Sequence, residues 1–150
     1  MGYRSDVTIL IYGETNEVVA FVAGERLKKK PATEYHPLDE PLNDRHERNK
    51  YEYDSTTVLE FIWWDIKWYD TYPEIDYWER LMSLWADAFS TTSLCMEVAR
   101  VGENSDDIIT DYYGDNPEYF LNVSRAITTD LPSKAKKVLS PIINKESNDE

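Results

Sequence analysis

The chain has 150 residues, of which 29 are acidic and 16 basic, and its formal net charge is −13 at pH 7. Such a charge repels nucleic acids and anionic membranes, and it favours basic partners or partners that normally bind a polyanion. The chain is 41% hydrophobic with five tryptophans and eleven tyrosines, which is too aromatic for a disordered protein and sufficient for one domain. We expect a cytoplasmic protein, because its one cysteine cannot form an internal disulfide and no stretch is apolar enough to span a membrane.

The first strand is predicted at residues 7–12, which are rich in β-branched side chains and are followed by a glycine. A helix is expected from about residue 16 to residue 29, with Thr15 as its N-cap and Pro31 as its stop signal. Residues 31–55 contain three prolines and many charges without a hydrophobic period, so they are predicted to form a long loop.

Residues 56–68 are predicted to form a central strand, because both faces are apolar for much of its length. If helices cover only one face of the sheet, one aromatic set must lie exposed on the other face. Such a patch marks a contact with a partner or with a second copy of the chain. The alternation assigns the exposed set either to Trp64, Ile66 and Trp68 or to Phe61 and Trp63.

The clearest element is a helix that begins near Pro73, a residue that suits the first helical turn. Its apolar residues recur at steps of three and four, which is the spacing of one helical face. They are Ile75, Trp78, Met82, Trp85 and Phe89. We expect this stripe to be buried against the sheet.

Further strands are predicted at residues 94–99, 107–113 and 119–128, and a short helix at residues 134–139. Without the short strand at residues 107–113 and the short helix, the order of the main elements is β-α-β-α-β-β. This order predicts the α+β class: a two-layer α/β sandwich whose mostly antiparallel sheet carries two helices on one face. We expect residues 1–130 to form this single α/β domain and residues 131–150 to be a C-terminal extension that is partly flexible.

Four segments of the chain resemble a family of small, uncharacterised proteins of tailed phages. They are Met-Gly-Tyr-Arg-Ser-Asp at residues 1–6, Ile-Lys-Trp-Tyr-Asp-Thr-Tyr-Pro-Glu at 66–74, Arg-Val-Gly-Glu-Asn-Ser-Asp-Asp at 100–107 and Val-Ser-Arg-Ala-Ile at 123–127. The family has no assigned activity, so the resemblance implies a phage setting and no chemistry. Small phage proteins commonly inhibit or redirect a host machine, which implies an anti-defence role or a host target that handles nucleic acid.

Residues 103–118 carry six acidic side chains and no lysine or arginine, and two tyrosines lie among them. The predicted partner-binding residues are Glu103, Asp106, Asp107, Asp111, Tyr112, Tyr113, Asp115 and Glu118. Carboxylates displayed in this way can imitate part of the phosphate spacing of DNA, and tyrosines add contact area. The segment is therefore interpreted as a surface for a basic groove, and the alternative is an ordinary solvated loop.

No group of residues in the sequence predicts a catalytic centre. His36 and His46 fall in the predicted loop, Cys95 falls in a predicted strand, and the acidic segment lacks the spacing of a calcium loop. The sequence has no glycine-rich phosphate loop and no nucleophile or zinc motif of known spacing. We therefore expect no catalytic residues, no metal and no cofactor, and the alternative is an acid–base site made only of carboxylates, such as Glu60 with Asp65.

Basic residues cluster only at residues 28–30 and at Lys134, Lys136 and Lys137, so direct binding of nucleic acid is not expected. The leading hypothesis is an acidic, non-enzymatic module that inhibits a host protein by occupying a basic surface. A second hypothesis is a small-ligand-binding protein or enzyme with a pocket between sheet and helices. A third is a self-assembling subunit that uses the aromatic sheet face as a homo-oligomer contact.

Overall fold

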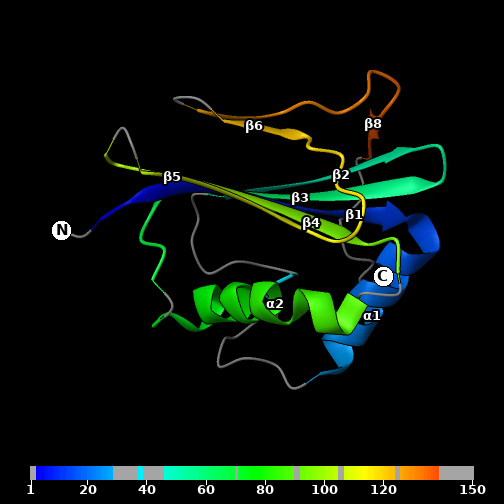
Figure 1. The fold of residues 1–150 in the computed structure, drawn as a ribbon, viewed down its shortest axis with the longest axis horizontal. Helices are drawn as coiled ribbons and strands as arrows, with labels where there is room; N and C mark the ends of the chain where they lie inside the picture. Colours follow the sequence, from blue (N-terminus) through cyan, green and yellow to red (C-terminus); the bar gives the residue numbers. More distant parts are fainter. Residues whose placement is uncertain are drawn as a thin grey trace, which may run out of the picture.

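In a computed structural model, which describes residues 3–28, 37–38, 46–69, 71–89, 92–104, 107–123 and 126–138, an antiparallel sheet forms the centre of the molecule (Figure 1). Its six strands lie in the order β5-β4-β1-β3-β2-β8. They are β1 (Ser5–Glu14), β2 (His46–Tyr53), β3 (Thr56–Ile66), β4 (Cys95–Gly102), β5 (Ile108–Tyr113) and β8 (Lys136–Lys137). A separate hairpin consists of β6 (Leu121–Val123) and β7 (Ile127–Thr129), and the helices are α1 (Thr15–Leu27) and α2 (Pro73–Phe89). The predicted α+β class, with a mostly antiparallel sheet and two helices, is confirmed.

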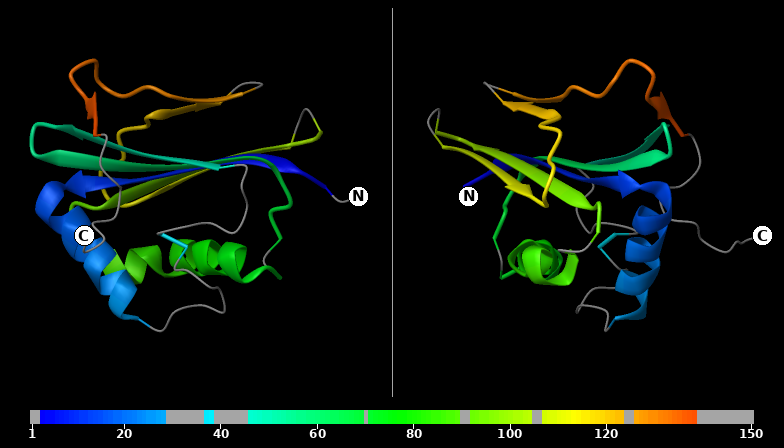
Figure 2. Two further views of the ribbon diagram at one scale, coloured as in Figure 1. Left: turned by 180° about the vertical axis from the view of Figure 1, so that it is seen from behind. Right: turned by 45° about the vertical axis from the view of Figure 1, so that its right-hand side comes forward.

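Both faces of the sheet are covered. Figures 1 and 2 show α1 and α2 on one face and the β6–β7 hairpin on the other. The expected two-layer arrangement with one open face is therefore wrong in this respect. The single strand predicted at residues 119–128 is instead a hairpin folded over the sheet, and it adds Phe120 and Leu121 to a second core around Leu10 and Val58. Burial of this apolar surface is the physical reason for the third layer.

The core between sheet and helices is built on the predicted stripe of α2. Ile75, Trp78, Met82 and Trp85 are all buried, whereas the side chain of Phe89 lies outside the described part. Trp78 is at the centre, with its ring centroid 4.9 Å from that of Phe61 and 5.6 Å from that of Trp63. No helix in the described ranges is long and apolar enough to cross a membrane.

A β-bulge overturns the predicted aromatic interface. The register between β1 and β3 passes from Val7↔Trp63 to Ser5↔Ile66, so β3 contains one extra residue at this point. Asp65 adopts a φ of 57°, a left-handed conformation that such a bulge can require. The extra residue turns Ile66 and Trp68 into the helix-side core, where they are 2% and 7% exposed, and leaves only Trp64 exposed, at 42%.

Two further predictions along the chain are wrong. The long loop predicted at residues 31–55 contains β2, whose polar sequence gives little strand signal but whose backbone pairs with β3 over its whole length. The helix predicted at residues 134–139 is replaced by a turn and β8, which pairs with the outer edge of β2. In both cases the pairing with another strand decides the local structure.

Candidate functional site

The acidic segment runs along β5 at the edge of the sheet, so its members lie in three different places. Glu103 and Asp107 lie at one end and hold the start of the chain. The Glu103 carboxylate accepts a hydrogen bond from the Arg4 backbone N–H at 2.8 Å, and the Asp107 carboxylate accepts one from the Tyr3 hydroxyl at 2.6 Å. These two acids therefore have a structural role, and Asp106 lies outside the described residues.

The middle of the segment alternates between the two faces of the sheet. Tyr113 is half-buried and packs against the helix-side core, and Asp111 is exposed on the same face. Tyr112 points to the other face, where its ring packs edge-on against that of Tyr119 with 4.7 Å between centroids. Tyr112 is 38% and Tyr119 63% exposed, so they form an accessible tyrosine pair.

The end of the segment forms one wall of a cleft of about 260 Å³. Asp115 and Glu118 meet Glu14, from the end of β1, and all three carboxylates are exposed. Tyr12 and Tyr53 and the hydroxyl side chains of Thr56, Thr92 and Ser93 complete the lining. We call the group Glu14, Tyr53, Asp115 and Glu118 the acidic cleft.

A glycine is required where the chain turns into this cleft. Gly114 adopts a φ of 114°, which side-chain-bearing residues rarely adopt. A Cβ atom at this position would lie 2.7 Å from the Cys95 Sγ atom and 2.8 Å from the Leu94 carbonyl oxygen. The turn therefore passes close to β4 and directs Asp115 to the cleft.

The electrostatic effect of the cleft appears in its neighbours. Burial raises the pKa of the Tyr53 hydroxyl, and the charges of Glu118 and Asp54 raise it further. Burial likewise raises the pKa of the Cys95 thiol, with Glu97, Glu118 and Asp115 adding to the shift. A negative potential therefore extends through the cleft and favours a cationic ligand.

A buried carboxylate beneath the cleft positions the wall residues. The Glu97 side chain is fully buried and accepts hydrogen bonds from the Tyr12 hydroxyl, from Tyr119 N–H at 2.7 Å and from Leu121 N–H at 3.1 Å. The Glu118 N–H donates to the Tyr12 hydroxyl oxygen at 2.8 Å. These bonds hold Tyr119 at a φ of 58°, a left-handed conformation that costs a tyrosine roughly 1–2 kcal/mol. Glu97 thereby presents the Tyr119 ring and the Glu118 carboxylate to solvent.

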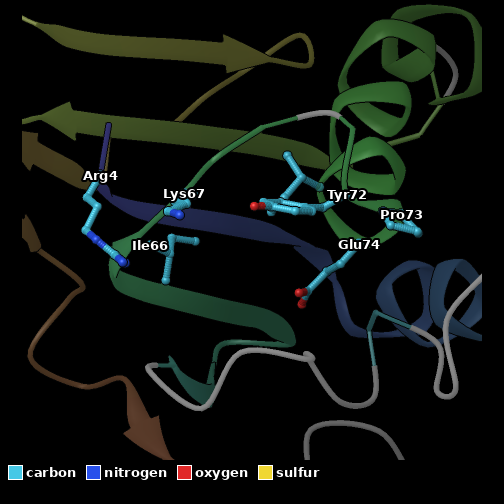
Figure 3. Close-up of a pocket in the computed structure, with 7 residues that line it drawn as sticks. Arg4, Ile66, Lys67, Tyr72, Pro73 and Glu74 are labelled. Carbon is cyan, nitrogen blue, oxygen red and sulfur yellow. The ribbon is translucent and has the colours of Figure 1, made fainter. Parts of the chain in front are cut away.

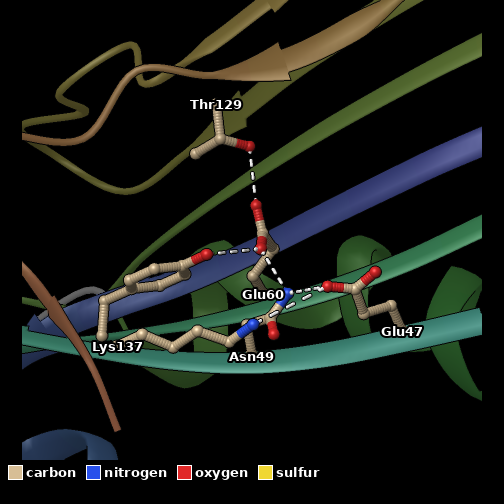
Figure 4. Close-up of polar contacts among 6 residues, drawn as sticks. Glu47, Asn49, Glu60, Thr129 and Lys137 are labelled. Atoms are coloured by element: carbon tan, nitrogen blue, oxygen red, sulfur yellow. Dashed lines mark hydrogen bonds and ion pairs between the residues drawn. The ribbon is translucent and has the colours of Figure 1, made fainter.

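A second buried carboxylate, Glu60, holds the other half of the covering segment (Figure 4). It accepts hydrogen bonds from Asn49 Nδ2 at 2.9 Å, from the Thr129 hydroxyl at 2.8 Å and from the Tyr51 hydroxyl at 3.3 Å. Burial and the Glu60 charge raise the pKa of Tyr51 to about 12. Every polar contact of Glu60 in the described ranges joins β3 to β2 or β7, so this residue has a structural role.

A separate pocket of about 400 Å³ lies between the end of β3 and the start of α2 (Figure 3). Arg4 and Lys67 line one side and Glu74 the other, and Ile66, Tyr72, Pro73 and Ile75 complete it. The Arg4 guanidinium donates one hydrogen bond, at 3.0 Å, to the Asp65 carbonyl oxygen, which fixes it at the rim. The pocket can accept a small molecule with an anionic group.

Of the residues weighed for catalysis, the two that the structure describes, His46 and Cys95, lie toward opposite ends of the sheet. His46 begins β2, Cys95 lies buried in β4, and His36 lies outside the described residues. The raised pKa of the Cys95 thiol keeps it protonated near neutral pH, which makes it a poor nucleophile. Among the residues that the structure describes, no group of three or more His, Cys, Asp or Glu side chains can hold a metal ion.

Sequence reasoning missed Glu14 and Tyr53 as residues of the acidic cleft, and Asp54 as a charge near Tyr53. Glu14 is about 100 positions from Asp115 in the chain, so no local pattern connects them. Tyr53 and Asp54 fell in the predicted loop. The Asp54–Ser55 pair was the sequence signal that could have indicated a hairpin turn here. Both residues adopt positive φ in the two-residue turn between β2 and β3.

No family model, curated protein or solved structure matches this chain. The functional inference therefore rests on the geometry and charge of the acidic cleft and its surroundings.

Proposed function

We propose that this protein is an acidic protein-binding module that inhibits a partner by occupying its basic surface. The observation that carries the proposal is the acidic cleft: Glu14, Asp115 and Glu118 converge on one cavity and remain exposed. Carboxylates that converge in this way suit the guanidinium or ammonium group of a partner's arginine or lysine. A cleft of this volume can admit such a side chain.

The tyrosine pair extends the proposed surface. Tyr112 and Tyr119 are exposed, and their rings support each other, so they offer rigid contact area. Tyrosines at the centre of an interface with charges around them are typical of protein-binding surfaces. Carboxylates and tyrosines together therefore favour a protein partner over a small cation.

A partner that normally binds nucleic acid suits this surface best. Asp111 lies on the edge strand β5, and Asp115 and Glu118 follow the end of that strand. Exposed negative charges therefore continue along this edge of the sheet, as they do along a polyanion. The resemblance to small phage proteins supports a host protein as the target. We therefore propose a host defence or nucleic-acid-handling protein as the partner, with DNA mimicry as the mode of binding.

Reversing charge in the acidic cleft is expected to weaken partner binding by at least about tenfold, since each charge pair contributes on the order of 1 kcal/mol or more at an interface. The variant is Asp115→Lys with Glu118→Lys. Neither side chain has a hydrogen bond in the described ranges that its loss would break. Wild type and variant would each be used to capture proteins from host lysate, and affinity for the captured protein would be measured at two salt concentrations.

The matched control is Asp76→Lys, which reverses a partly exposed charge that pairs with Arg80 on the same helix, α2. This helix covers the face of the sheet opposite the β6–β7 hairpin (Figure 1). This control variant should bind the partner with the affinity of wild type. A partner that both variants bind as tightly as wild type, with no change in salt dependence, would contradict the proposed surface.

The pocket between β3 and α2 supports a second candidate function, the binding of a small anionic molecule. Lys67→Gln is expected to lower the affinity for such a ligand by about tenfold, because a hydrogen bond to a charged group contributes about 1.5–3 kcal/mol. Ligand-observed NMR with inorganic phosphate and citrate would test this. Lys136→Gln, on β8, is the control. If neither anion binds wild type at millimolar concentration, this second candidate is wrong for these ligands.

A further inference from the structure

The chain places one of its own basic segments against the outer edge of β2. In β8, Lys136 and Lys137 pair antiparallel with Glu52 and Tyr51. The Val138 N–H then donates a hydrogen bond to the Lys50 carbonyl oxygen at 2.8 Å. Residues 134–138 therefore add a short strand to the sheet, as a bound peptide does in β-strand addition.

The lysines of this segment contact acidic side chains around β2. The Lys134 ammonium pairs with the Asp54 carboxylate and lies over the Tyr53 ring, 5.9 Å from its centroid. The Lys137 Nζ atom lies 4.0 Å from the Glu47 Oε2 atom, and Figure 4 marks this ion pair with a dashed line. Tyr53 also lines the acidic cleft, so the start of the segment, at Lys134, lies beside the proposed binding surface.

This strand is held much less firmly than the segment that precedes it. It forms two residue pairs, its lysines are exposed, and exposed ion pairs contribute little to stability. Residues 119–123 and 126–129, by contrast, are held by the buried carboxylates Glu97 and Glu60 and by apolar burial. Residues 134–138 can therefore leave the edge of β2 while the hairpin stays in place.

We infer that the edge of β2 is the docking site for an extended lysine- or arginine-rich segment of the partner, and that residues 134–138 are a built-in competitor for it. This inference rests on the proposed function, since it specifies how a basic partner reaches the acidic cleft. An incoming strand would donate a main-chain hydrogen bond to the Lys50 carbonyl oxygen in place of the Val138 N–H. Its lysines or arginines would form ion pairs with Glu47 and Asp54 in place of Lys137 and Lys134. Only the fraction of molecules with an open edge can bind, so the competitor lowers the apparent affinity.

The test measures binding of a fluorescent peptide with the sequence of residues 131–140 to full-length protein. In the released variant, Lys134→Gln and Lys137→Gln remove the ion pairs, and Val138→Pro removes the N–H that bonds to Lys50. We expect the released variant to bind the peptide at least about tenfold more tightly than wild type. Adding Glu47→Gln and Asp54→Asn to it should remove most of this gain.

The control is Arg80→Gln with Arg100→Gln, which removes two positive charges from α2 and from β4, a strand that is separated from β2 by β1 and β3. It should bind the peptide as wild type does. Equal affinity in wild type and the released variant, or an equal gain in the control, would overturn the inference. If the variant with Val138→Pro does not fold, Lys134→Gln with Lys137→Gln alone is compared with wild type in the same peptide-binding experiment, and the same outcomes apply. Because the probe is a defined peptide, this result is independent of whether lysate capture finds a partner.

Discussion

Replacing Trp78 with alanine is expected to lower the free energy of unfolding by about 3–5 kcal/mol, the usual cost of removing a large aromatic side chain from a core. Trp78 is fully buried, and its ring packs against those of Phe61, Trp63 and Tyr77 at centroid distances of 4.9, 5.6 and 5.3 Å. The cavity would open between α2 and the centre of the sheet, where neighbouring strands cannot move in to fill it. A domain of this size has a total stability of only about 5–15 kcal/mol.

Urea unfolding followed by tryptophan fluorescence and circular dichroism would measure the loss. Leu84→Ala is the matched control, because Leu84 lies on the same helix with most of its side chain in solvent. It should change stability by no more than about 0.5 kcal/mol. A loss below about 1 kcal/mol for Trp78→Ala would mean that the stripe of α2 does not form the core.

Glu97→Ala is expected to lower the free energy of unfolding by about 3 kcal/mol or more. The substitution removes the acceptor for two buried donors and one partly buried donor, and each buried donor without an acceptor costs about 1–3 kcal/mol. These donors are the Tyr12 hydroxyl and the backbone N–H groups of Tyr119 and Leu121. Because Tyr119 would also lose the bond that supports its left-handed backbone, the wall of the acidic cleft should become mobile.

Two measurements separate these effects: urea unfolding for stability, and amide hydrogen exchange at Tyr119 and Leu121 for local release. Exchange at both amides should accelerate more than exchange within β1. Glu52→Ala, an exposed carboxylate on β2, serves as the control and should leave both readouts near wild type. Unchanged exchange at Tyr119 in Glu97→Ala would show that another contact positions the cleft wall.

The elements that sequence patterns predicted correctly are those whose own residues bury an apolar face. The stripe of α2 repeats at the helical period, and residues 7–12 and 56–68 are apolar enough to indicate strands without knowledge of their neighbours. Residues 94–99 and 107–113 also contained recognisable strands, and β4 and β5 lie there. In α2, β1, β3 and β4 the local hydrophobic pattern agrees with the final burial, whereas β5 is an edge strand without a buried residue.

The elements that were missed have little local signal. The sequence of β2, His-Glu-Arg-Asn-Lys-Tyr-Glu-Tyr, is polar, and it becomes a strand because β3 offers a complete ladder after a two-residue turn. The bulge at Asp65 reverses the faces of Ile66 and Trp68, a change that simple alternation cannot anticipate. A one-residue insertion in a strand moves every later side chain to the other face.

The sequence by itself determined the acidity of this protein, its helical core stripe and the acidic character of residues 103–118. Only the tertiary structure decided which acids meet. It separated Glu103 and Asp107 from Asp115 and Glu118 along β5, and it brought Glu14 to the latter pair. The physical reason is that charge is a property of each residue, whereas convergence on a cleft depends on strand order and on turns that join distant parts of the chain.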